Sequence, residues 1–204
     1  SKRIIYQAGE LIFGGVIPAT TDWSVAQESM SKLIALANTR ILGKAEYSAS
    51  PQNDLCINPT EYEDALSKIC SSDKDMVVRF IAASNLVKDE PIRSNIELYP
   101  DRNVYSNGEM ITNGEFVTDG TQAMAQQILL NFLHDINTIA SANGVLPDPL
   151  RGSIGVISMN QLYDVTDAMV GIKGKILLTA YSRGDTNILG PLRLIIKVEK
   201  INED

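Results

Sequence analysis

The chain has 204 residues, of which 44% are hydrophobic and 21% charged, with a formal net charge of −7 and a pI near 4.8. These values are ordinary for a globular protein, and the length suits one large domain or two small ones. The acidic balance and scattered Lys and Arg disfavour a nucleic-acid binder, and no apolar run approaches the roughly 20 residues of a membrane helix.

The first predicted elements are two strands and a helix. Residues 3–7 and 10–17 are rich in Ile, Val and Phe and are separated by an Ala-Gly turn signal, which favours strands. A helix is expected from the N-cap Asp22 until Gly43. Its apolar residues recur at helical spacing: Trp23, Ala26, Met30, Leu33, Ala37 and Ile41.

A second helix is expected after a short strand at residues 55–57. Its start carries Asn58 as N-cap, a proline in the first turn, and Glu61 three residues after the cap, which can reach back to the cap. A buried strand at 76–83 follows. The strand at 91–99 then alternates apolar and polar residues and ends the first hundred residues.

The second half of the chain repeats the first. Paired residues initially lie 99 positions apart, as in Arg3 and Arg102, Tyr6 and Tyr105, Glu10 and Glu109, and Asn38 and Asn137. After a one-residue slip within 40–54 the offset becomes 100, as in Asp64 and Asp164, and Arg93 and Arg193. One register with a single gap predicts an internal duplication of a unit of about 100 residues, 1–101 and 102–204, related by a pseudo-twofold axis.

The order of elements suggests how the strands pair. From residue 91 to 182 the chain runs three strands, helix, strand, helix, strand, which is similar to the ribonuclease H-like fold. Consecutive strands are then expected to be antiparallel, and strand–helix–strand connections parallel. Residues 3–83 lack a leading strand in this frame. We therefore expect residues 191–199 to complete the first unit by strand exchange.

These expectations define one fold class. We predict an α/β (mixed α+β) protein with two mixed sheets and flanking helices. The two units would be intertwined in a single structural domain, so residues 3–83 would not fold alone.

The sequence carries no recognisable catalytic, cofactor or metal pattern. A nuclease of the ribonuclease H type needs metal-binding acids on its first strand, but residues 91–99 contain only Glu97, whose repeat mate is Lys197. His134, the only histidine, is interpreted as a surface or interface residue, and Asp148 as a turn residue. Nucleophile-elbow, phosphate-loop and dinucleotide motifs are absent. We expect no cofactor and no enzymatic activity.

Two cysteines, Cys56 and Cys70, are too few for a disulfide framework and do not form a zinc motif. We expect both to be buried, reduced thiols.

Repeated charged residues are the candidate interaction or structural pairs. Gly9 and Gly108 are expected to adopt positive φ at turns. Beside them Arg and Glu could pair across each hairpin, namely Arg3 with Glu10 and Arg102 with Glu109. Arg93 and Arg193 could form an anion-binding pair or be exposed sheet residues.

Three stretches, RNVYSNGEM, ANGVLPDPLRGSIG and DTNILGPLRLIIKV, resemble an uncharacterised bacterial family catalogued as a domain of unknown function. The resemblance implies a C-terminal domain that follows membrane helices and a long coiled coil. A chain that opens with Ser rather than Met fits a fragment of such a protein. The resemblance implies no catalytic residues.

Two functions are compatible with these observations. The first is a non-enzymatic protein-interaction or assembly module of a membrane-tethered coiled-coil protein. It would lie in the cytoplasm, bind a protein partner or itself, and meet a membrane only through segments outside this chain. The alternative is a ribonuclease H-like nucleic-acid-binding or nuclease-related domain, which a cluster of three acids at the ends of adjacent strands would favour.

Overall fold

The computed structural model describes residues 2–43 and 54–202. The chain divides into two compact units, residues 1–101 with 148–151 (unit 1) and residues 102–147 with 152–204 (unit 2). In the described part of the chain each unit has two helices and one four-stranded mixed sheet, which confirms the mixed α+β class. The segment 40–54, where the repeat changes offset, lies largely outside the described residues.

The elements of unit 1 follow the predicted order. They are β1 (Ile4–Tyr6), β2 (Leu11–Ile17), α1 (Trp23–Leu42), β3 (Leu55–Ile57), α2 (Pro59–Ser71), β4 (Met76–Ala82), β5 (Leu86–Val87) and β6 (Ile92–Pro100). The Asp22 carboxylate accepts from the backbone N–H groups of Ser24 and Val25, and Gly43 is the C-cap of α1. Both predicted ends of this helix are therefore confirmed.

The elements of unit 2 follow the same order. They are β7 (Asn103–Tyr105), β8 (Met110–Thr118), α3 (Gln122–Ala142), β9 (Gly155–Val156), α4 (Met159–Met169), β10 (Gly174–Ser182), β11 (Thr186–Asn187) and β12 (Leu192–Lys200). The two-residue strands β5 and β11 were not predicted, because each carries too few residues to show an alternating pattern.

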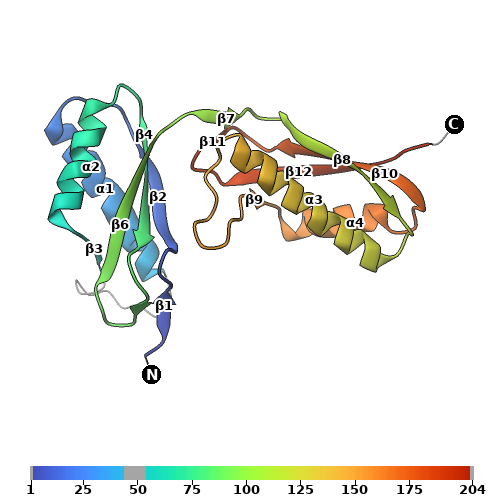
Figure 1. The fold of residues 1–204 in the computed structure, drawn as a ribbon, viewed down its shortest axis with the longest axis horizontal. Coiled ribbons are helices and arrows are strands. Elements are labelled where there is room, and N and C mark those ends of the chain that lie inside the picture. The colour runs from blue at the N-terminus through green and yellow to red at the C-terminus, as the bar shows by residue number, and fades with distance from the viewer. Residues whose placement is uncertain (1, 44–53, 203–204) are drawn as a thin grey trace. The chain divides into compact units, whose positions relative to one another are not determined.

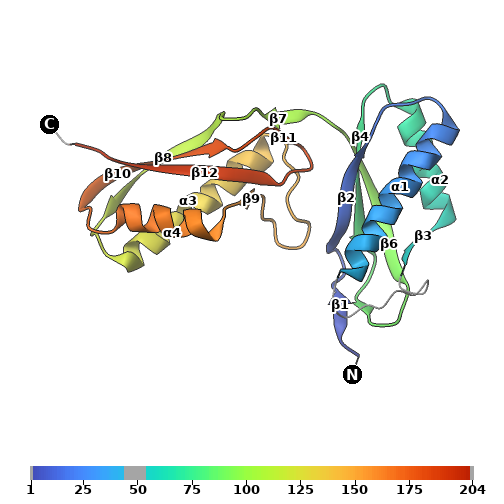
Figure 2. The same cartoon turned by 180° about the vertical axis from the view of Figure 1, so that it is seen from behind.

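Both sheets have the same strand order and directions. In unit 1 the order is β2-β4-β6-β3, with β3 parallel to β6 and the other pairs antiparallel. In unit 2 the order is β8-β10-β12-β9, with β9 parallel to β12. The short strands form separate antiparallel pairs, β1 with β5 and β7 with β11. Within each unit both helices cover one face of the four-stranded sheet (Figure 1 and Figure 2).

The predicted strand exchange is wrong. Strand β12, which covers most of 191–199, pairs with β10 and β9 of its own unit, while β6 pairs with β4 and β3. The three-strand frame of the ribonuclease H-like interpretation requires β6 to pair with β7 or β8, and β6 pairs with neither. Closing the short connection between β10 and β12 costs little chain entropy, which favours the partner that is near in sequence.

Each unit buries its own core between helices and sheet. In unit 1 the core side chains of α1 and α2 meet those of alternate β4 positions: Met76, Val78, Phe80 and Ala82. In unit 2 the corresponding β10 residues are Ile176, Leu178 and Ala180. Gly15 of β2 lies close under α1, because an added Cβ would come within 2.3 Å of Leu33 Cδ1. A glycine at this position thus permits close helix–sheet packing in unit 1.

Candidate functional site

The repeated glutamates stabilise one turn in each unit. Glu10 Oε2 accepts from the Gln7 N–H at 2.9 Å, and Glu109 Oε2 accepts from the Ser106 N–H at 2.8 Å. The glycine before each glutamate has positive φ, +84° and +78°. This confirms the predicted conformation of both glycines and gives the glutamates a structural role.

The repeated arginines at the start of each unit are exposed. Arg102 donates from Nη2 to the backbone carbonyl of Asn143 at 2.6 Å, at the C-cap of α3. This contact places the guanidinium at the carbonyl end of the helix, where a positive charge is favourable, and the pairing of Arg102 with Glu109 stays a prediction. The pairing of Arg3 with Glu10 stays a prediction.

Arg93 and Arg193 are exposed and point away from the helices of their units. They follow the alternation of β6 and β12, in which both neighbours of each arginine are buried. In the sheet register Arg93 lies beside Cys56, and Arg193 beside Val156. Their joint action as an anion-binding pair stays a prediction.

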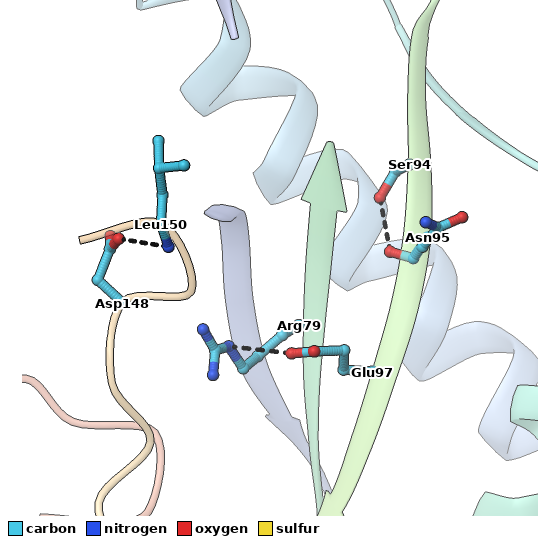
Figure 3. Close-up of polar contacts among 6 residues, drawn as sticks. All are labelled: Arg79, Ser94, Asn95, Glu97, Asp148 and Leu150. Carbon is cyan, nitrogen blue, oxygen red and sulfur yellow. Dashed lines mark hydrogen bonds and ion pairs between the residues drawn. The ribbon is translucent and has the colours of Figure 1, made fainter. Parts of the chain in front are cut away.

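A polar cluster lies on the helix-free face of the unit 1 sheet. Arg79 on β4 and Glu97 on β6 are register partners, and Figure 3 shows their side chains pointing toward one another. Their Nε and Oε1 atoms are 3.6 Å apart, an ion pair longer than a hydrogen bond, and Arg79 is only 4% exposed. A buried guanidinium requires such compensation, so Glu97 has a structural role beside Arg79.

Tyr99 belongs to the same cluster. Burial raises the pKa of its hydroxyl above the ordinary value, the Glu97 carboxylate raises it further, and Arg79 lowers it. The tyrosine therefore stays neutral beside the ion pair at physiological pH.

Unit 2 has different residues at the positions that correspond to this cluster. The residues 100 positions later are Thr179, Lys197 and Glu199, and Thr179 pairs in register with Lys197 as Arg79 does with Glu97. Lys197 Nζ instead lies 5.2 Å from the centroid of the Tyr181 ring. The two sheets thus share a geometry while their helix-free faces differ in chemistry.

The structure also shows the surroundings of the two cysteines, His134 and Asp148. Cys56 and Cys70 are free, as predicted, but neither is fully buried. Cys56 is exposed, because Leu55 and Ile57 take the inward positions of β3, and Cys70 is partly buried at the end of α2. His134 is exposed, as expected of a surface residue. Asp148 Oδ1 accepts from the Leu150 and Arg151 N–H groups, which confirms a turn role; Figure 3 shows the bond to Leu150.

The feature that sequence reasoning missed is an apolar stripe on α4 and its C-cap. Met159, Tyr163 and Val170 are 63%, 59% and 44% exposed. Their spacing of i, i+4 and i+11 places them within about 40° of one another around the helix. The sequence shows these apolar residues, but only the structure shows that Val165 and Met169 form the buried face of the helix and leave the three uncovered. We call Met159, Tyr163 and Val170 the α4 stripe.

Within residues 2–43 and 54–202, no three His, Cys, Asp or Glu side chains are grouped so that they could hold a metal ion. None of the helices in those ranges combines the length and apolarity that crossing a membrane requires. Comparison of the chain with protein-family models, curated proteins and solved structures finds no match.

Proposed function

We propose that the chain is a non-enzymatic protein-interaction module built on an internal duplication, and that the α4 stripe is its docking surface. The module would be the C-terminal part of a larger, membrane-tethered coiled-coil protein in the cytoplasm, with its halves related by a pseudo-twofold axis. The single observation that carries the docking function is the exposed α4 stripe.

Repeated hydrogen bonds support the duplication. Asn38 Oδ1 accepts from the Leu55 N–H at the start of β3, and Asn137 Oδ1 accepts from the Gly155 N–H at the start of β9. Backbone bonds repeat as well: Gly9 donates to Ala82, and Gly108 to Ser182. Side chains at matching positions therefore fix the same strand starts and turns in both units.

The exposed residues of α2 and α4 differ, although the two helices have corresponding places in their units. Residues 100 positions before Met159, Tyr163 and Val170 are Pro59, Glu63 and Cys70. Both Pro59 and Glu63 are exposed, so unit 1 presents a proline and a charge where unit 2 presents a thioether and a phenol. Since neither set is needed to build the shared fold, the apolar set of unit 2 supports a separate role.

Binding is the role that this chemistry favours. Exposed Tyr and Met are enriched at protein interfaces, and two apolar anchors at i and i+4 are a common pattern of helix recognition. Covering these apolar side chains would remove them from water and so favour association, whereas covering scattered polar residues would not.

The test is cross-linking followed by direct binding. A photoreactive phenylalanine derivative at position 159 is used to capture partners in the source cells, and each captured protein is purified. It should then bind the wild-type chain, and Tyr163→Glu should weaken this binding at least tenfold. Ala168→Glu is the matched control, because residue 168 is exposed on the other flank of the same helix. Equal binding to both variants would reject the proposal.

A further inference from the structure

We infer that the segment that covers the α4 stripe is a basic amphipathic helix of a partner protein. This inference rests on the proposed function and deepens it by giving the chemistry of the partner. The observations behind it are the charges around the stripe and the closed backbone of α4.

The two helices of unit 2 carry acidic side chains but no Lys or Arg. The sequences of α3 and α4 contain no Lys or Arg, whereas α1 carries Lys32 and Arg40 and α2 carries Lys68. The acids of α3 and α4 are all exposed: Asp135, Asp164 and Asp167. The nearest cation after α4, Lys173, acts electrostatically on Asp119. The surface beside the stripe is therefore negative.

The acids of α4 are interleaved with the apolar anchors. Asp167 follows Tyr163 by four residues and precedes Val170 by three, so it lies along the stripe. Asp164 lies about 100° around the helix from Tyr163, on the exposed side beyond Asp167. A partner that covers Met159 and Tyr163 must accept carboxylates at its rim. Lys or Arg flanking its own apolar residues would satisfy them and exclude acidic competitors.

The backbone of α4 decides between a helical and an extended partner. The N–H and C=O groups inside a helix are already paired, so α4 cannot extend a sheet with an incoming strand. A segment that docks against it gains no backbone hydrogen bonds, which favours a helix, since a helix pairs its own backbone groups and presents anchors at i and i+4. Anionic lipid and nucleic acid carry the wrong charge for this surface.

The test uses selection rather than a known partner. A display library of helix-forming peptides with randomised surface residues is selected on the full chain. Enriched peptides should carry net positive charge. They should bind the Tyr163→Glu variant at least tenfold more weakly, even though its added negative charge would by itself attract a basic peptide. Ala168→Glu should leave affinity unchanged. The double variant Asp164→Asn, Asp167→Asn and added salt should each weaken binding several-fold.

The possible failures are distinguishable. Enriched peptides that are neutral or acidic, yet need Tyr163, would overturn the basic helix and leave the docking function standing. Peptides that bind the wild-type chain and Tyr163→Glu equally would remove the α4 stripe as a docking surface and thus the proposed function. Phosphatidylglycerol vesicles are tested in parallel, and Tyr163-dependent binding to them would overturn the protein partner.

Discussion

At the scale of single residues, Glu61 has a role that its position in the sequence disguises. Asn58 caps α2 as predicted, accepting from the Thr60 and Glu61 N–H groups. Glu61 Oε1, however, accepts from the Ile96 N–H of β6 instead of reaching back to the cap. The reason is geometric: β3 pairs with β6 only as far as Ser94, so the donor of Ile96 lies beyond the end of that strand.

Removing this carboxylate should expose the Ile96 amide. For Glu61→Ala we expect Ile96 hydrogen exchange to accelerate about tenfold or more, since an unsatisfied half-buried donor costs about 1–2 kcal/mol. Glu61→Gln should retain part of the protection, because its amide oxygen can still accept. Exchange measured by NMR tests this, with Glu63→Ala as the exposed control on the same helix. An unchanged Ile96 rate in Glu61→Ala would show that the bond does not persist in solution.

Predictability from sequence also differs by residue type. The caps Asp22 and Asn58 and the glycines with positive φ were predictable, because each acts within a few residues of itself. Arg102 and Glu61 were not, since their partners Asn143 and Ile96 lie 41 and 35 residues away. The sequence provides the chemistry of such a side chain but not its long-range partner.

At the scale of elements, the strand pairing was the part that sequence patterns could not provide. The α1 helix and the long strands were predicted nearly to their ends, because hydrophobic periodicity reports which face is buried. Periodicity is silent about which strand lies next to which. Both β6 and β12 alternate in the same way, so either could have completed either sheet. The α4 stripe was missed for a related reason: a pattern shows apolar residues but not which of them stay uncovered.

The observed pairing makes a prediction about fragments. Residues 1–101 contain every strand of the sheet β2-β4-β6-β3, and the core of unit 1 draws on residues of that range. We expect this fragment to fold alone and to give a dispersed NMR spectrum. A fragment of residues 1–90 lacks β6, which lies between β4 and β3, and should stay unfolded. Folding of the 1–90 fragment, or failure of the 1–101 fragment in otherwise stabilising buffer, would contradict the assignment of β6 to unit 1.

At the scale of the whole molecule, the two units are the same scaffold with different surfaces. Asn38 and Asn137, and Glu10 and Glu109, make matching hydrogen bonds. Other corresponding positions differ, as in Arg79 and Thr179, and Glu97 and Lys197. Gln161 stands at the position that corresponds to Glu61, but it does not make the matching hydrogen bond. Its Oε1 atom is buried and accepts no hydrogen bond from the described residues. The position corresponding to Ile96 in unit 2 is Ile196 of β12.

Gln161→Glu should therefore transfer the bond of unit 1 to unit 2. If the two scaffolds are equivalent, the new carboxylate reaches the Ile196 N–H as Glu61 reaches Ile96, and a charge-assisted bond is stronger than an amide one. We expect Ile196 hydrogen exchange to slow about tenfold, which corresponds to about 1.4 kcal/mol. The Gln161→Met variant, similar in length but without an acceptor, is the control and should not slow exchange. Faster exchange in Gln161→Glu would mean that α4 sits differently over β12 than α2 does over β6, and the equivalence of the units would fail at this contact.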